Sequence, residues 1–202
     1  MSETTAEHKL PPPGTRMTAA EFLALPETAA RIELIDGVVV YPFGFEGEDA
    51  VSPAPDLSHQ LVAARVFTLL SRLIPGGTLL FAPVDFRLDD NTVIQPDVLW
   101  IAPDSACARR EGSGYRGVPD LAVEVLSPAT AKHDRVYKFR AYETHGCREY
   151  WLADPANAYL EVWTLRGSRF ERLGVFAGDD VFESPALGGR SVPVQEIFAP
   201  VE

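Results

Sequence analysis

Apolar and polar positions along the chain follow two periods, one typical of helices and one typical of strands. The longest helical pattern extends from Asp56, a predicted N-cap, to about Ile74, and Pro75-Gly76-Gly77 ends it. Its apolar residues lie at helical spacing and are Leu61, Val62, Val66, Leu69, Leu70 and Leu73. A shorter helix is predicted to begin near Met17, because the residues that follow have the spacing of a capping box.

Strand patterns account for most of the remaining elements. A hairpin is predicted within 31–41, where two β-rich arms flank Asp36-Gly37, a strong signal for a two-residue turn. Further strands are predicted at 78–81, 84–88, 93–102, 121–126, 149–153, 159–165 and 170–176, a helix at 132–144 and a short element at 194–198. Residues 44–55 and 103–119, rich in turn-forming residues, are predicted to be loops.

The order of these elements predicts an α/β domain in which helices flank a mixed β-sheet. The run 122–126 is apolar except for Glu124, as expected of a strand that is covered on both faces. Residues 1–16 are polar and proline-rich and are expected to form a flexible arm, and residues 17–202 a single domain without an internal linker or repeat.

The composition is that of an ordinary globular protein, with 202 residues of which 46% are hydrophobic and 23% charged. No apolar run approaches the roughly 18 to 20 residues of a membrane span, so no membrane association is expected. The N-terminus lacks the apolar core of a signal peptide. Two cysteines are too few for a disulfide framework, which favours a reducing, cytoplasmic location.

The net charge of −11 argues against broad, nonspecific binding of nucleic acid, which depends on Lys and Arg. The charge is uneven, however, because the stretch from Ser105 to Arg148 carries eight basic and five acidic residues. This stretch could face a phosphate backbone, or it could simply be a solvated surface.

Three carboxylates lie within or beside apolar runs, at Glu33, Asp97 and Glu124. Burial of an unpaired carboxylate is costly, so each of them needs a partner. A hard cation such as Mg²⁺ would provide one, because it takes oxygen ligands, commonly one or two carboxylates together with water. Alternatively, each carboxylate pairs with an arginine or caps a backbone turn.

Five blocks of the sequence resemble, in the same order, the Uma-type family of restriction endonucleases. They are RIELIDGVVV, SPAPDLSHQ, IQPDVLWI, PDLAVEVLSPAT and DRVYKFRAYETHGCREYWLADP. The combination of Pro96-Asp97 with a later strand that carries Glu124 also resembles the wider PD-(D/E)xK nuclease superfamily. The likeness covers roughly 17–165 and implies a restriction-endonuclease-like mixed β-sheet flanked by helices, with metal-dependent cleavage of DNA.

The resemblance implies that Asp97, Glu124 and the Val125 carbonyl bind Mg²⁺ or Mn²⁺, and that Glu33 is an auxiliary acidic residue. One departure concerns the superfamily lysine, because Leu126 stands where that lysine would fall. The resemblance places the lysine on the next helix, at Lys138. There Asp134 and Tyr142 lie four residues to either side and share its face. Alternatively, Asp134 and Lys138 form only a surface ion pair.

Other candidates carry weaker signals. His59, in the first turns of the long helix, could face the same site, although such a histidine is more often a core or capping residue. Tyr142 could contact substrate, although packing is the more common role. Ser52, Ser58 and Ser127 lack the surroundings of a nucleophile elbow. Cys107 and Cys147 form no zinc or redox motif.

The first hypothesis is therefore a metal-dependent endonuclease that acts on DNA. The second is a non-catalytic binding or assembly module on the same scaffold, which the acidic charge and the displaced lysine favour. A glycosidase that uses Glu124 and Asp97 as acid and base ranks last, because an aromatic sugar platform is missing. By analogy with small nucleases that cut both strands, a homodimer is predicted, with exposed apolar strands of the tail as its interface.

Overall fold

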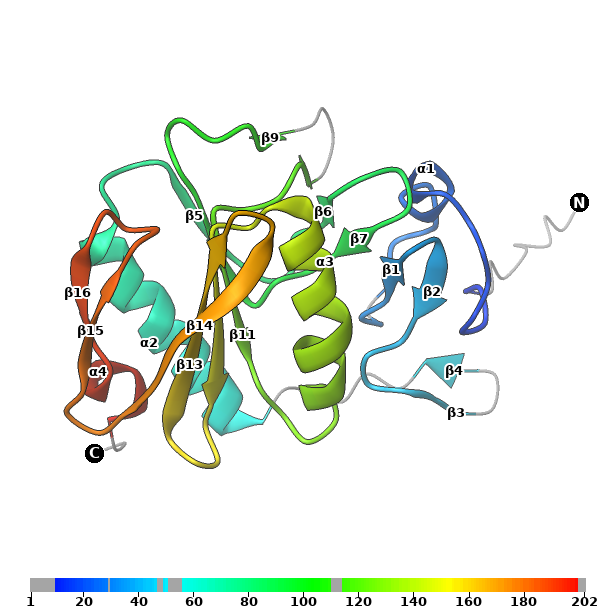
Figure 1. The fold of residues 1–202 in the computed structure, drawn as a ribbon. Helices are drawn as coiled ribbons and strands as arrows, with labels where there is room; N and C mark the ends of the chain where they lie inside the picture. The colour runs from blue at the N-terminus through cyan, green and yellow to red at the C-terminus, as the bar shows by residue number, and fades with distance from the viewer. Residues whose placement is uncertain (1–9, 29, 47–48, 51–55, 110–113, 200–202) are drawn as a thin grey trace, which may run out of the picture.

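The computed structural model describes residues 10–28, 30–46, 49–50, 56–109 and 114–199. Its centre is a six-stranded mixed sheet with the strand order β14-β13-β12-β11-β8-β5 (Figure 1). The strands are β5 (Thr78–Phe81), β8 (Val98–Ile101), β11 (Leu121–Val125), β12 (Glu149–Asp154), β13 (Tyr159–Arg166) and β14 (Arg169–Ala177). β11 and β12 run parallel, and the other neighbouring pairs run antiparallel. The predicted α/β class with a mixed sheet and flanking helices is confirmed.

Helices cover both faces of this sheet. Alternate residues of each strand point to opposite faces, so each strand contributes side chains to two separate cores. Val98 and Trp100 of β8 pack in a core with α2 (Leu57–Leu73), the long helix predicted from the sequence. Leu99 and Ile101 pack in a second core with α3 (Phe139–His145). The sheet is thus the middle layer between α2 and α3 (Figure 1).

A second six-stranded sheet lies beside this layer, with the strand order β2-β1-β7-β6-β10-β9. Its strands are β1 (Glu33–Ile35), β2 (Val38–Val40), β6 (Phe86–Arg87), β7 (Val93–Ile94), β9 (Ala108–Arg109) and β10 (Tyr115–Arg116). The predicted hairpin is present as β1 and β2, and Asp36 and Gly37 have φ of 52° and 75°, as a type I′ turn requires. The short helix α1 (Ala19–Phe22) begins with the predicted capping box at Thr18.

The long strand predicted over 93–102 is wrong, because the chain leaves one sheet and enters the other within it. β7 belongs to the second sheet and β8 to the central sheet. The residues between them are Gln95, Pro96 and Asp97, and Pro96 has no N–H with which to continue a ladder. Periodicity misses this break because both halves are apolar. The break places Asp97 at the boundary between the two sheets.

The helix predicted over 132–144 is present, but half of it is wound differently. Residues His133–Lys138 form a π-helical segment, η1, which continues directly into α3. Gly146 ends the helix in the left-handed conformation, with φ of 85°. π-helical turns inside helices are rare and are frequently found at functional sites.

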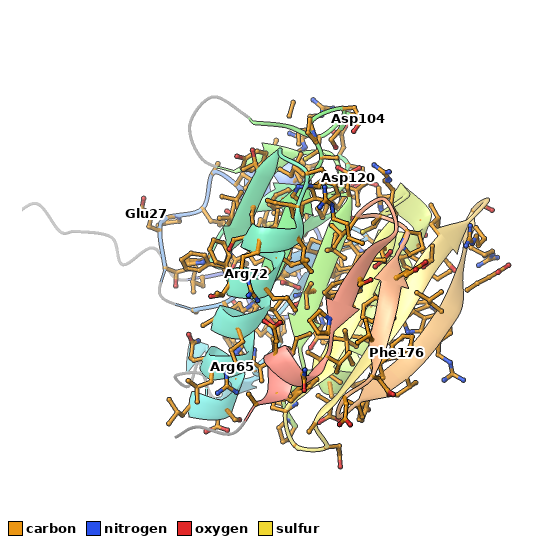
Figure 2. All side chains as sticks on the ribbon, turned by 90° about the vertical axis from the view of Figure 1, so that its left-hand side faces the viewer. Glu27, Arg65, Arg72, Asp104, Asp120 and Phe176 are labelled. Carbon is orange, nitrogen blue, oxygen red and sulfur yellow. The ribbon has the colours of Figure 1, made fainter. Side chains whose placement is uncertain are left out.

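The tail forms a hairpin of β15 (Val181–Ser184) and β16 (Arg190–Pro193), followed by α4 (Gln195–Phe198). The prediction that the apolar residues of the tail are exposed is wrong for most of these residues. Phe182, Val192, Val194 and Ile197 are buried in the core that α2 covers. Figure 2 shows α4 beside α2. Arg72 of α2 pairs there with Glu196 of α4, and the Arg65 side chain donates to the Ala199 carbonyl.

The residues before α1 and the two predicted loops contain further backbone pairing. Within the predicted arm, the Gly14 N–H donates to the Val39 carbonyl at 2.9 Å, and the Tyr41 hydroxyl donates to the Pro11 carbonyl at 2.7 Å; residues 1–9 lie outside the described residues. The loop predicted at 44–55 contains β3 (Phe45–Glu46) and β4 (Asp49–Ala50), and that at 103–119 contains β9 and β10. No helix in the described part of the chain combines the length and apolar character needed to cross a membrane.

Candidate functional site

Asp97 and Glu124 meet at adjacent strands of the central sheet. β8 and β11 are antiparallel with Val98 opposite Val123, and continuation of this register places Asp97 opposite Glu124. Residues directly opposite in an antiparallel pair point to the same face and lie close together. The two acids, far apart in the chain, are therefore neighbours in the fold.

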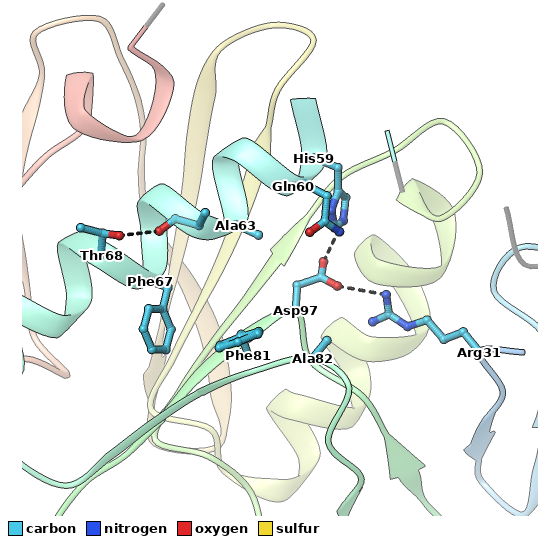
Figure 3. A pocket seen from close by; sticks show the side chains of 10 residues that line it. Arg31, His59, Gln60, Ala63, Phe67, Thr68, Phe81, Ala82 and Asp97 are labelled. Carbon is cyan, nitrogen blue, oxygen red and sulfur yellow. Dashed lines mark hydrogen bonds and ion pairs between the residues drawn. The ribbon is translucent and has the colours of Figure 1, made fainter. Parts of the chain in front are cut away.

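Asp97 is held by three groups from three different segments. Its Oδ2 accepts the Val125 N–H at 2.8 Å, and its Oδ1 accepts from Arg31 Nη1 at 3.0 Å. His59 Nε2, in the first turn of α2, lies 3.3 Å from Asp97 Oδ2. Figure 3 shows Asp97 between His59 and Arg31. Asp97 is consequently a junction between β11, α2 and the strand that follows Arg31.

Glu124 is fully buried and faces the helix formed by η1 and α3. Its Oε2 accepts from Lys138 Nζ at 2.9 Å, and its Oε1 accepts from the Tyr142 hydroxyl at 2.9 Å. Each oxygen of the Glu124 carboxyl group therefore accepts one hydrogen bond. Tyr142 therefore contacts the candidate site itself as well as packing in the core.

Lys138 is the centre of a buried ionic network. Besides Glu124, its Nζ lies 3.2 Å from Glu33 Oε1 and 3.7 Å from Asp134 Oδ1, and it donates to the Gln95 carbonyl at 3.0 Å. The side chain is 1% exposed. The alternative of a surface ion pair is therefore wrong for Lys138.

Glu33 lies on β1 and joins the second sheet to this network. Its Oε1 accepts the Gln95 N–H at 3.0 Å, and its Oε2 lies 2.6 Å from His133 Nε2. His133 is the first residue of η1 and Lys138 the last. Glu33 thus binds both ends of the π-helical segment.

Arg31 brings a second cation between the carboxylates. Its guanidinium contacts Asp97 at 3.0 Å and lies 3.9 Å from both Glu124 Oε2 and Glu33 Oε1. It also donates from Nη2 to the Gln95 carbonyl. One cationic group therefore touches both of the predicted metal ligands.

The charges in the network shift one another's pKa values. Burial would raise the pKa of Asp97, but the His59 hydrogen bond and the charges of Arg31 and Lys138 hold it well below its usual range. At Glu33, burial would again raise the pKa, but Lys138 and His133 outweigh it and lower the pKa to about 2. For Lys138, the opposing carboxylates outweigh burial and raise its pKa.

Glu124 has the opposite tendency. Burial raises its pKa well above the ordinary value, and Asp97 and Asp134 add to this effect while Lys138 opposes it. An additional positive charge beside Glu124 would favour its ionised form.

The oxygen ligands present suit Mg²⁺ or Mn²⁺. Asp97 and Glu124 already share one cationic group, Arg31, and His59 Nδ1 is buried without a hydrogen-bond partner beside them. Val125 reaches Asp97 through its N–H. Within the described residues, no group of three or more His, Cys, Asp or Glu side chains is arranged to hold a metal ion. Asp97 and Glu124 are the two carboxylates here that could share an ion, with backbone oxygen or water as its further ligands.

A pocket of about 310 Å³ opens beside Asp97 (Figure 3). Arg31, His59 and Asp97 line one end of it, and side chains of α2 and β5 line the other. The candidate carboxylate is thus accessible from a cavity although its side chain is 6% exposed.

Sequence reasoning missed several members of the network. Arg31 and Glu33 are two residues apart, as are Gln95 and Asp97, which places each pair on one face of an extended segment. This two-residue spacing is visible in the sequence and could have identified Arg31 and Gln95 as members of the network. His133 is five residues before Lys138, the spacing of a π-helix, which a helical period of 3.6 does not predict.

In the described part of 105–148, three basic residues form ion pairs with buried carboxylates, whereas Arg116, Lys132 and Arg140 are exposed. Lys138 is buried, Arg135 Nη1 lies 2.6 Å from Glu161 Oε2, and Arg148 Nη1 lies 3.2 Å from Asp120 Oδ1. These three cations form internal ion pairs, and Arg109 and Arg116 lie on the short strands β9 and β10.

Similarity to known proteins is found both in the sequence and in the fold. Residues 19–195 match the model of the family Uma2, whose description is "Putative restriction endonuclease". The fold is similar to the crystal structure of a putative nuclease from Anabaena variabilis, with a TM-score of 0.69 and 19% identity over 91% of this chain and 98% of that chain. At this identity the similarity concerns the fold alone. Among curated proteins, no match was found.

Proposed function

This chain belongs to the Uma2 family, and on that premise we propose that it is a metal-dependent endonuclease that hydrolyses DNA phosphodiester bonds. The observation that carries the proposal is the convergence of Asp97, which immediately precedes β8, with Glu124 of β11 and Lys138 of η1. Two carboxylates and a buried lysine combine the ligands for a cation with a fixed positive charge. This is the equipment that phosphodiester hydrolysis requires.

Asp97 and Glu124, with the Val125 carbonyl, are the residues that would hold Mg²⁺ or Mn²⁺. The ion, when bound, lowers the pKa of a water molecule and stabilises negative charge on the phosphate. Lys138 stabilises the same charge or orients the attacking water. Glu33 positions Lys138 through its contact at 3.2 Å.

Surrounding residues keep these groups in place. The Val125 N–H and His59 fix Asp97, and Tyr142 fixes Glu124 through its hydroxyl. Arg31 neutralises Asp97 and Glu124 in the absence of an ion. Arg31 also lines one end of the pocket. If an ion neutralises the two carboxylates instead, Arg31 can bind a phosphate oxygen there.

The test is cleavage of DNA in the presence of Mg²⁺ or Mn²⁺ by Asp97→Asn and Glu124→Gln variants. These amides keep the shape of each side chain but remove its negative charge, so cleavage should fall at least 100-fold, roughly the loss that follows removal of one key electrostatic group. Glu183→Gln, at an exposed position of β15, is the matched control. Full activity in both site variants would remove the two acids from the reaction.

A binding or assembly module is the second candidate, and one observation favours it. The buried carboxylates are already balanced by Arg31 and Lys138 within the protein. Calorimetric titration with Mn²⁺ separates the two functions. Binding that disappears in Asp97→Asn supports the nuclease, whereas the absence of any binding heat supports the module.

A homodimer in the cytoplasm completes the proposal, since two copies can address both strands of a duplex. The apolar residues still exposed on the tail and its neighbouring strand are Leu173, Val175 and Val181. Sedimentation at micromolar concentration tests this part independently. A single monomeric species would remove the dimer and leave the proposed chemistry unaffected.

A further inference from the structure

We propose that the pocket beside Asp97 binds an unpaired or extruded base, and that the protein therefore acts where nucleic acid is single-stranded or locally unpaired. The part of the inference that concerns the cleaved substrate rests on the proposed function. The part that concerns base binding by the pocket does not depend on it.

One wall of the pocket is a single face of α2. His59, Ala63 and Phe67 lie four residues apart and share that face. At 1.5 Å of rise per residue, the wall extends about 12 Å from the histidine to the phenylalanine. Ala63 contributes only a methyl group, which leaves the volume of about 310 Å³ open.

The opposite wall carries an exposed aromatic ring. Phe81, at the end of β5, is 61% exposed. Its ring is held by an edge contact with Phe67, with centroids 5.2 Å apart and an interplanar angle of 82° (Figure 3). A large apolar side chain that is exposed and yet supported by a neighbouring ring is a surface on which another flat ring can stack.

The pocket is continuous with the candidate catalytic site. Phe81 pairs with Val98 across β5 and β8, and the Ala82 N–H donates to the Asp97 carbonyl at 3.0 Å. Phe81 therefore lies beside the start of β8, which Asp97 immediately precedes. A base stacked on Phe81 would belong to a nucleotide whose phosphate lies near Asp97 and Arg31.

The two ends of the pocket match the two parts of a nucleotide. Arg31 provides a positive charge at one end for the phosphate, and Phe67 and Phe81 provide an apolar surface at the other for the base. Gln60, exposed on the same wall, offers both a donor and an acceptor for a base edge. In a duplex the base faces are covered by stacking, so only an unpaired or extruded base can enter such a pocket.

The test measures binding of a fluorescent oligothymidylate by anisotropy, with Ca²⁺ in place of Mg²⁺ to prevent cleavage. The comparison strand has the same backbone but abasic sites in place of its bases. The unmodified protein should bind the base-bearing strand roughly fivefold to 100-fold more tightly, the range for stacking of one base. A duplex of the same length should bind no better than the abasic strand.

Two variants locate that preference. Phe81→Ala removes the stacking surface at an exposed position, and Ala63→Trp fills the pocket; both should bind base-bearing and abasic strands equally. Leu57→Ala, an exposed apolar position at the start of α2 that does not line the pocket, is the control and should retain the full preference. Equal affinity for the two strands in the unmodified protein, or an undiminished preference in both pocket variants, would overturn the inference.

The same measurements separate this inference from the proposed function. Loss of cleavage in Asp97→Asn with a base preference that does not depend on Phe81 leaves the nuclease standing and removes the base pocket. Loss of base preference in Phe81→Ala, with metal binding that does not depend on Asp97, leaves a base-binding pocket in a protein without the proposed metal site.

Discussion

Lys138 Nζ lies 2.9 Å from Glu124 Oε2, and both side chains are 1% exposed. The two residues come from the π-helical segment η1 and from β11, so their contact fixes the helix against the central sheet. A buried ion pair of this kind gains little net stability over an apolar pair, but loss of one partner leaves the other charge uncompensated. This relationship leads to the first prediction.

Lys138→Met should lower the free energy of unfolding by about 3 to 5 kcal/mol, because Glu33 and Glu124 lose the cation between them. Urea denaturation at neutral pH measures the change. Lys132→Met, at an exposed position on the same helix, is the matched control and should change stability by less than about 0.5 kcal/mol. Addition of Glu124→Gln to Lys138→Met should restore part of the loss; a double variant as unstable as the sum of its parts would contradict this explanation.

Arg31→Gln should bind Mn²⁺ more tightly than the unmodified protein. The guanidinium lies 3.0 Å from Asp97 and 3.9 Å from Glu124, where a second cation would be repelled. Unit charges about 4 Å apart interact by about 4 kcal/mol near a protein surface, so a gain of at least roughly tenfold in affinity is expected. Calorimetry measures it, and DNA cleavage by the same variant should nevertheless fall, because Arg31 no longer reaches the phosphate. Weaker binding of Mn²⁺ would show that Arg31 supports the ion site instead of competing with it.

Glu33 should make the protein sensitive to acid. Its pKa falls from 4.5 to about 2 in the fold, although burial opposes the change, because of Lys138 and His133. A carboxylate with a depressed pKa contributes stability that is fully present above its unfolded pKa and disappears as the pH falls towards its folded pKa. The contribution, roughly 3 kcal/mol, should therefore be lost between about pH 4.5 and pH 2.

Glu33→Gln isolates this contribution. Urea denaturation at a series of pH values from 6 to 3 should show a smaller loss of stability in the variant than in the unmodified protein, since residue 33 no longer titrates. The remaining acid sensitivity should come from carboxylates such as Asp97, whose pKa is also depressed. Identical slopes for the two proteins would mean that Glu33 has an ordinary pKa.

Cys107 should react slowly in the folded protein. Burial raises the pKa of its thiol to about 11, and Asp120 adds to the effect. At pH 8 its thiolate fraction is about 0.1%, so alkylation should be roughly 100-fold slower than that of an ordinary cysteine. Burial raises the pKa of Cys147 as well. Iodoacetamide labelling followed by mass spectrometry checks this, and both cysteines should react readily in urea. Rapid labelling of Cys107 in the native protein would show that the pKa of its thiol is not raised.

The two proposed metal ligands can be identified in the sequence because burial of a carboxylate leaves a local signal. Glu124 interrupts an apolar strand, and Asp97 precedes one, so each residue stands out against its neighbours. Lys138 was found through resemblance to a family, since its spacing on a helix does not distinguish a buried cation from a surface ion pair. Its burial between β1 and β11 follows only from the fold.

Most elements follow from local sequence patterns: the capped first helix, the Asp36-Gly37 hairpin, the long helix α2 and the final strands of the central sheet. These depend on local capping, turn geometry and periodicity, which neighbouring residues encode. The division of 93–102 between two sheets and the pairing of Arg31 with Asp97 follow only from the complete fold. Partners in a buried ionic network are selected by distances between elements remote in the chain, and no local pattern records those distances.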